Sequence, residues 1–141
     1  MNRIINILLV DDDNLDQIDV VRTLDRKNIF HRLKTAKNGE DALAMITGND
    51  HTVFSGKPDI ILLDLNMPKM DGFELLQRIK QNDALKEIKV FILTTSDEHD
   101  DKHKALALGA SGFITKPLKF ESPSSMDAFN LMIDLMNIQA T

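Results

Sequence analysis

The chain contains five short segments whose sequences predict β-strands. Loops and stretches with helical periodicity separate them. The segments are Ile4–Val10, His31–Ala36, Ile60–Leu63, Ile88–Leu93 and Ser111–Thr115. The run Ile60–Leu63 contains no polar residue, which is typical of a strand that is buried on both faces. Strands that alternate with helices form parallel sheets with right-handed crossovers. The pattern predicts an α/β fold, a doubly wound (βα)5 three-layer sandwich with one sheet between two layers of helices.

The helical patterns follow the strands in turn. We expect helices after Asp13 or Asn14 (inward residues Leu15, Ile18, Val21 and Leu24), over Glu40–Ile46, from Phe73 to Ile79, over Glu98–Leu108, and from Ser122 to about Ile138. Five such units suit the strand order 2-1-3-4-5, whose switch point lies between the first and third strands. This order brings the carboxyl ends of those two strands to one crevice.

Acidic side chains gather at the predicted carboxyl ends of the first and third strands. Asp11, Asp12 and Asp13 follow the first strand directly, and Asp64 ends the run Ile60–Leu63. One acid is enough to cap the following helix, and packed carboxylates repel one another unless a cation lies between them. A solvated acidic loop is the alternative. Asp11, Asp12 and Asp64 offer the hard oxygen ligands that suit Mg²⁺, so we predict a magnesium site there.

Two further polar residues follow the fourth and fifth strands. Thr94 comes directly after Ile88–Leu93, and Lys116 comes directly after Ser111–Thr115. Lys116 is suited to bind phosphoryl oxygens, and the Thr94 hydroxyl is suited to donate a hydrogen bond to one of them. Beside a bound Mg²⁺, the Asp64 carboxylate is suited to attack phosphorus and to form an acyl phosphate.

Composition narrows the function classes. The chain has 141 residues, which predicts a single domain over residues 1–141. It has no Cys, which excludes thiol catalysis, and its net charge of -5 disfavours nucleic-acid binding. No apolar run reaches the ~18 residues of a membrane span, and no signal segment is seen at the N-terminus. We therefore expect a cytoplasmic protein without membrane or nucleic-acid partners.

The ordered motifs resemble those of the receiver domain of two-component response regulators, the CheY-like family. They are Val10-Asp11-Asp12, Asp64-Leu65-Asn66-Met67-Pro68, Asp71-Gly72, Thr94 and Lys116-Pro117. The resemblance implies a flavodoxin-like fold and a protein that is not an enzyme beyond its own phosphorylation and dephosphorylation. It implies that a sensor histidine kinase or phosphotransfer protein phosphorylates Asp64 with Mg²⁺ as cofactor, and that the signal passes on through a changed interaction surface.

The same resemblance implies a role for each site residue. Asp11, Asp12, Asp64 and the main-chain carbonyl of Asn66 would hold Mg²⁺, and Lys116 would bind the phosphoryl group. Thr94 and Phe113 would form the switch, although Phe113 lacks the hydroxyl of the Tyr often found there. The long connection before Pro58 also looks like that of regulators paired with phytochrome-type sensor kinases.

Three other functions are alternatives to this one. A haloacid-dehalogenase-type phosphatase needs a second Asp two positions after its nucleophile, where this chain has Asn66. An FMN-binding module needs a Ser, Thr or Gly-rich phosphate loop after the first strand, where this chain has Asp11, Asp12 and Asp13. A receiver-like domain that binds partners without being phosphorylated is the third alternative.

The last predicted helix is apolar over more of its surface than one buried face requires. Its apolar residues cover roughly 240° of the helical wheel, and Asp127, Asn130, Asp134 and Asn137 share the remaining arc. A stripe of ~100° is enough to pack on a sheet. The surplus must be covered by the loop Leu118–Ser125 of the same domain or by another chain. We favour a partner surface, for which a symmetric homodimer is the commonest outcome.

This homodimer can be tested by light scattering over a concentration series, with and without beryllofluoride as a mimic of the phosphoryl group. We expect the average mass to rise toward that of a dimer as the protein concentration rises. The mimic should change the concentration at which half of the chains are dimeric. A protein that stays monomeric under both conditions would rule the dimer out.

Overall fold

The computed structural model describes residues 4–47, 57–65, 72–94, 99–116, 130 and 134. Within these ranges, parallel strands form one sheet in the order β2-β1-β3-β4-β5, as predicted. The strands are β1 Ile5–Val10, β2 His31–Ala36, β3 Ile60–Asp64, β4 Lys89–Thr94 and β5 Gly112–Thr115. Each predicted strand is therefore confirmed, with ends that differ by about one residue.

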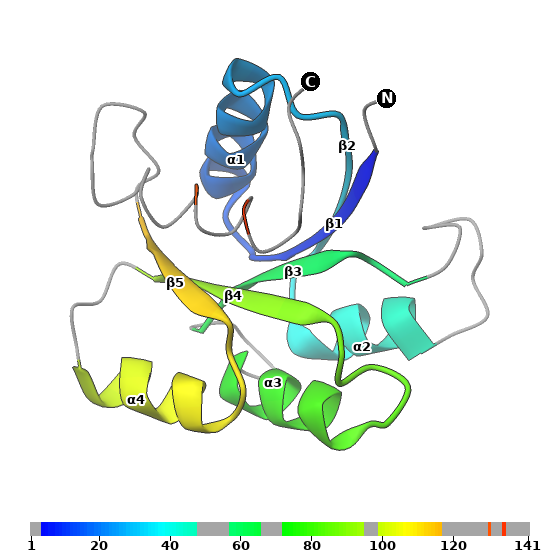
Figure 1. The fold of residues 1–141 in the computed structure, drawn as a ribbon, viewed down its shortest axis with the longest axis vertical. Helices are drawn as coiled ribbons and strands as arrows, with labels where there is room; N and C mark the ends of the chain where they lie inside the picture. The colour runs from blue at the N-terminus through cyan, green and yellow to red at the C-terminus, as the bar shows by residue number, and fades with distance from the viewer. Residues whose placement is uncertain are drawn as a thin grey trace.

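Helices cover both faces of the sheet. They are α1 Asn14–Arg26, α2 Gly39–Thr47, α3 Gly72–Gln81 and α4 His99–Ala107. Figure 1 shows α1 on one face, and α2, α3 and α4 on the other. Asp13 caps α1, since its carboxylate accepts a hydrogen bond from the main-chain N–H of Leu15 at 2.8 Å. Gly109 follows α4 with a φ of 105°, a left-handed conformation that favours glycine.

The central strands divide the core between the two faces. In β1, Leu8 and Val10 pack in the cluster on the side of α2 and α3, whereas Ile7 and Leu9 pack in the cluster on the side of α1. All residues of β3 are buried. Because both faces of these strands are covered by apolar side chains, the carboxyl ends of β1 and β3 stand on a close-packed support.

The inward face of α1 differs from the predicted one. Leu15 and Ile18 were expected to face the core, but they are 68% and 45% exposed. Leu24 is buried, as predicted, and Val21 is half-buried. The other buried residues of the helix are Val20 and Thr23. The core-facing row of α1 starts one position later than the apolar periodicity indicates, and it passes through Asp16 at its N-terminal end.

The last predicted helix is described only at Asn130 and Asp134, which are helical and exposed. Both positions belong to the polar arc that the sequence predicts. The Asn130 Oδ1 atom accepts a hydrogen bond at 2.6 Å from the Nζ of Lys27, which follows α1. Asn130 therefore lies beside the C-terminal end of α1, whereas the apolar residues of the predicted helix lie outside the described ranges.

Gly72, at the start of α3, packs against the main chain at the end of β3. The two segments lie so close together that a side chain at position 72 has no room. The Gly72 N–H donates a hydrogen bond to the Leu65 carbonyl oxygen at 3.2 Å. A Cβ atom at this position would lie 2.6 Å from the Asp64 carbonyl oxygen and 2.7 Å from the Leu65 Cα. Both are main-chain atoms of the strand end, so neither can rotate away.

We expect Gly72→Ala to lower the free energy of unfolding by roughly 1–3 kcal/mol through this overpacking. Urea denaturation followed by circular dichroism measures the change. Gln77→Ala, at an exposed position of the same helix, is the control and should stay close to wild type. Equal stability of the Gly72 variant and the wild type would contradict the steric argument.

Candidate functional site

The register of the sheet places two carboxylates side by side. Val10 of β1 pairs with Leu63 of β3, so the next residues, Asp11 and Asp64, stand at the same edge of two adjacent strands. Asp11 is 5% exposed and Asp64 is 7% exposed, although both are charged residue types. Buried carboxylates need hydrogen bonds or counter-charges to offset their lost hydration. Their placement confirms that the strand order brings these acids together, as predicted.

Asp12 completes a group of three acids. One carboxylate oxygen from each of Asp11, Asp12 and Asp64 lies within 4.8 Å of the others, and Asp12 is exposed. This is a set of hard oxygen ligands with one side open to water. A hydrated divalent cation such as Mg²⁺ is held in proteins by few carboxylates together with waters. The donor set therefore fits the predicted cation.

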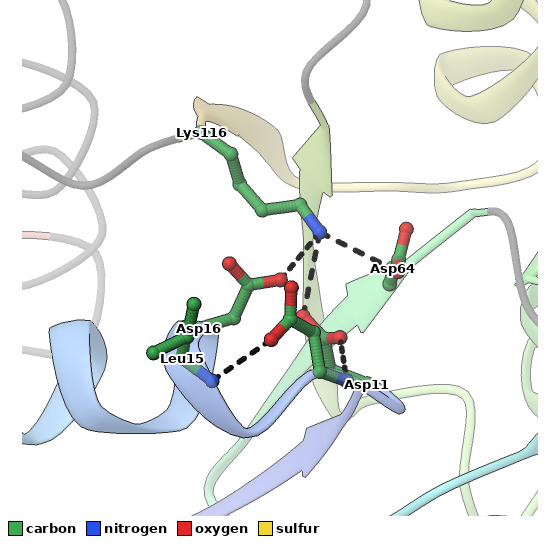
Figure 2. Close-up of polar contacts among 6 residues, drawn as sticks. Asp11, Leu15, Asp16, Asp64 and Lys116 are labelled. Atoms are coloured by element: carbon green, nitrogen blue, oxygen red, sulfur yellow. Dashed lines mark hydrogen bonds and ion pairs between the residues drawn. The ribbon is translucent and has the colours of Figure 1, made fainter.

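Lys116 brings a positive charge to these acids from the end of β5. Its Nζ atom lies 2.7 Å from Asp16 Oδ2, 3.4 Å from Asp11 Oδ2 and 3.4 Å from Asp64 Oδ2. Figure 2 shows the ammonium group between Asp16 of α1 and Asp64 of β3, with Asp11 beneath it. The Lys116 side chain is 11% exposed, so this cation is largely withdrawn from water.

The pKa of Lys116 reflects these partners. Burial alone would lower the pKa of the ammonium, but the hydrogen bond to Asp16 and the charges of Asp11 and Asp64 outweigh burial and raise it above its ordinary value. Lys116 therefore stays protonated throughout the physiological range. A fixed positive charge at this point is available to any anionic group that approaches Asp64.

The site shifts the pKa values of Asp11 and Asp16 in opposite directions. Burial, assisted by a hydrogen bond with Asp16, raises the pKa of Asp11 to about 7. Burial would also raise the pKa of Asp16, but hydrogen bonds with Asp11 and Lys116 lower it overall. The Asp11 side chain has no exposed surface whereas that of Asp16 is 14% exposed, so Asp11 is the member that retains a proton when no cation is bound.

Asp16 is the functional residue that the sequence reasoning missed. Its position in the first turn of α1 suggests an ordinary favourable acid near a helix N-terminus. The available signal was its spacing of four and seven residues from Val20 and Thr23, which puts a carboxylate on the buried face of the helix. An acid on that face requires a cation, and Lys116 is the cation that reaches it.

The other predicted site residues are only partly described. Thr94 ends β4 and pairs with Thr115 of β5, but its side chain lies outside the described part of the structure. Asn66 also lies outside the described residues. Phe113 pairs with Ile92 in the sheet and is partly buried against the cluster on the side of α3 and α4. The described site is thus made of Asp11, Asp12, Asp16, Asp64 and Lys116.

This arrangement is suited to the transfer of an anionic group onto a carboxylate. The three acids can bind a divalent cation, while Lys116 offers ammonium N–H donors next to Asp64. Together, a divalent cation and an ammonium group would balance the charge of a phosphoryl group that approaches an anionic nucleophile. With a divalent cation bound beside Lys116, the Asp64 carboxylate would be suited to accept a phosphoryl group.

Comparison with known proteins gives the same family in each case. The response regulator receiver domain family matches residues 7–124. Response regulator Rcp1 of Synechocystis is 41% identical over 110 residues, which cover 78% of this chain and 75% of Rcp1. The phosphorylated cyanobacterial phytochrome response regulator RcpA has a similar structure, with a TM-score of 0.78 and 31% identity over 99% of this chain and 98% of RcpA. The Mn²⁺-bound form of Rcp1 has a TM-score of 0.73 and 34% identity, and 96% of each chain is covered.

The raised pKa of Asp11 makes the stability of the metal-free protein depend on pH. The folded state holds a proton on Asp11 up to about pH 7, whereas the unfolded state loses it near 3.8. The free energy of unfolding should therefore fall as the pH rises from about 4 to about 7. Asp16, whose pKa is lowered, has the opposite effect only as the pH falls below its ordinary value near 3.8.

Urea denaturation in EDTA at several pH values between 5 and 8 measures this slope. Asp11→Asn lacks the titrating carboxyl group, so its free energy of unfolding should rise relative to that of the wild type as the pH rises. Two parallel pH profiles would show that Asp11 does not titrate in this window.

Proposed function

The chain belongs to the response regulator receiver domain family, and from this premise we propose that Asp64 is its phosphorylated residue. The family makes the protein a two-component response regulator receiver. The observation that carries the proposal is the position of the Lys116 ammonium. It lies 3.4 Å from Asp64, beside a group of acids able to hold a cation. Asp64 is the member of that group that ends the central strand β3.

The proposed reaction is an in-line transfer of a phosphoryl group. One Asp64 carboxylate oxygen attacks phosphorus of a phosphohistidine, and a new O–P bond forms. The P–N bond breaks and its electron pair returns to the imidazole nitrogen. Lys116 donates N–H groups to phosphoryl oxygens, since its pKa keeps it protonated. Asp64 thus ends as an acyl phosphate, and the donor ends as histidine.

We assign the divalent cation to Asp11, Asp12 and Asp64, with the main-chain carbonyl of Asn66 as a proposed fourth protein ligand. Family members bind a divalent metal at an acidic site, and the Rcp1 structure mentioned above contains Mn²⁺. The oxygens of the three acids here lie within 4.8 Å of one another, which supports the assignment. Mg²⁺ is the proposed ion because it combines few carboxylates with waters and a phosphate. When bound, it would neutralise charge on the phosphoryl oxygens and the acids.

Thr94 and Phe113 are the proposed switch. They lie on the adjacent strands β4 and β5, where Thr94 pairs with Thr115 and Phe113 pairs with Ile92. A phosphoryl group at Asp64 that engages the Thr94 hydroxyl would draw the end of β4 toward β3. The partly buried ring of Phe113 would then settle in a different position, which changes the surface beside α4.

Receiver domains are regulators rather than metabolic enzymes, and they interact with sensor histidine kinases or phosphotransfer proteins. By analogy with the phytochrome regulator RcpA, we propose a phytochrome-type sensor kinase as the phosphoryl donor. Hydrolysis of its own phosphoryl group is the only turnover that we propose for this chain. A homodimer through the last helix stays a prediction, since that helix is described only at Asn130 and Asp134.

No helix among the described residues has the length and apolar character to cross a bilayer. We propose that the protein acts in the cytoplasm, where sensor kinases present their phosphohistidine, and without a nucleic-acid partner. The net charge of -5 supports the last point.

Incubation with acetyl phosphate and Mg²⁺, followed by intact-protein mass spectrometry, tests the assignment. We expect one phosphoryl group per chain, none in Asp64→Asn, and little labelling when EDTA replaces Mg²⁺. Asp83→Asn is the control, because the Asp83 carboxylate is 96% exposed and remote in the sequence from the site.

The possible results separate the alternatives. Labelling that persists in Asp64→Asn would place the phosphoryl group on another residue. Release of phosphate without any accumulation of labelled protein would favour the phosphatase. No labelling and no release would favour a receiver-like domain that binds partners without phosphorylation.

A further inference from the structure

Lys116 has more acidic partners than the proposed phosphoryl transfer needs. A lysine ammonium has three N–H donors, and three carboxylates surround this one. The contact to Asp16 is 2.7 Å, the usual length of a charge-assisted hydrogen bond, whereas the contacts to Asp11 and Asp64 are 3.4 Å. In this structure, the ammonium is therefore bound more closely by Asp16 than by the proposed phosphoryl acceptor (Figure 2).

Asp16 is not one of the three acids that can hold the cation, although it forms a hydrogen bond with Asp11. That group is formed by Asp11, Asp12 and Asp64, which come from strand ends, whereas Asp16 comes from the first turn of α1. Its carboxylate is 14% exposed and lies on the same helix face as the buried residues Val20 and Thr23. Packing of that face against the sheet holds the carboxylate at Lys116.

We propose that Asp16 competes with the phosphoryl group on Asp64 for the Lys116 ammonium, and so weakens the retention of that group. This inference rests on the proposed function, because it needs Asp64 to be the phosphorylated residue. When Asp64 is phosphorylated, Lys116 must either share its donors or leave the 2.7 Å contact with Asp16. In both cases, the Asp16 carboxylate weakens the binding of the phosphoryl oxygens by the Lys116 ammonium.

Charge acts in the same direction as competition. A phosphoryl group adds negative charge beside Lys116, and the Asp16 carboxylate is a fixed negative charge on the other side of that ammonium. Exposure of only 11% and 14% for the two side chains keeps the pair from being screened like a surface ion pair.

Weaker retention has a defined chemical outcome. Water attacks phosphorus, the bond between the Asp64 oxygen and phosphorus breaks, and its electron pair returns to the Asp64 carboxylate. The proton lost by the water ends on phosphate or solvent, and inorganic phosphate leaves. No further reactant is needed. An ammonium divided between Asp16 and the phosphoryl group holds the ground state less firmly, so the regulator returns sooner to its unphosphorylated state.

The variant Asp16→Asn tests the proposal, since it removes the charge but keeps the size and one acceptor oxygen. Asp19→Asn is the matched control. It removes the same charge one turn later on α1, whereas the ion pairs of Lys116 within the described residues go to Asp11, Asp16 and Asp64. Beryllofluoride binding in saturating Mg²⁺ is followed by ¹⁹F NMR. The lifetime of the phosphoryl group is followed by mass spectrometry after acetyl phosphate is removed.

We expect Asp16→Asn to bind beryllofluoride roughly three- to tenfold more tightly and to keep its phosphoryl group longer by a similar factor, as the release of a partly buried charged hydrogen bond suggests. Asp19→Asn should match the wild type within about twofold, and the difference should persist in 0.5 M salt because the contact is direct. A purely structural role of Asp16 would alter thermal stability without tightening beryllofluoride binding.

Asp16→Ala separates competition from positioning. Under competition it also binds beryllofluoride more tightly than the wild type. Binding that is weakened in Asp16→Ala, or unchanged in Asp16→Asn, would overturn the proposal. If the wild type itself takes no label on Asp64, the proposed function fails first, and that result is distinct from equal lifetimes in labelled wild type and labelled variant.

Discussion

The candidate site depends on one buried ammonium surrounded by carboxylates. Asp11 and Asp64 are nearly inaccessible to water, and a pair of uncompensated charges in that position would be strongly unfavourable. Lys116 offsets that cost from the end of β5, at 3.4 Å from each. The strand order makes this possible, because β1, β3 and β5 all end at the same edge of the sheet and bring Asp11, Asp64 and Lys116 together there.

The core beneath the site holds these charges in position. β1 and β3 are covered on both faces, and their pairing at Val10 and Leu63 sets the distance between the two acids. Gly72 lets the start of α3 approach the main chain at Asp64 and Leu65 without a side chain between them. A packed interior responds to a change in volume by shifting its neighbours, so this support is coupled to the geometry of the acids.

The proposed switch depends on the balance of charge in the site. Without a cation, a proton on Asp11 and the Lys116 ammonium offset the acids, and burial raises the pKa of Asp11 accordingly. A divalent ion would replace the proton on Asp11, and a phosphoryl group would bind the Lys116 ammonium. The proposed competition by Asp16 of α1 would link the state of the site to a helix as well as to the strands.

Much of this protein follows from local pattern in the sequence. The strand runs, the turn residues and the acids and lysine at strand ends predict the parallel sheet and the meeting of Asp11, Asp12, Asp64 and Lys116. Polar groups at the carboxyl ends of parallel strands must share one edge, so pattern alone is enough there. Asn66 and the Thr94 side chain lie outside the described residues, so their predicted roles are not decided by the structure.

Only the tertiary structure decided the orientation of α1. The apolar residues Leu15 and Ile18 indicate one inward face, yet both are exposed, and Asp16 lies on the buried row with Val20 and Thr23. Periodicity identifies the side of a helix that avoids water, but it cannot include an ion pair with a residue 100 positions later in the chain. The contact between Asp16 and Lys116 exists because folding brings α1 and β5 together, which no local sequence pattern contains.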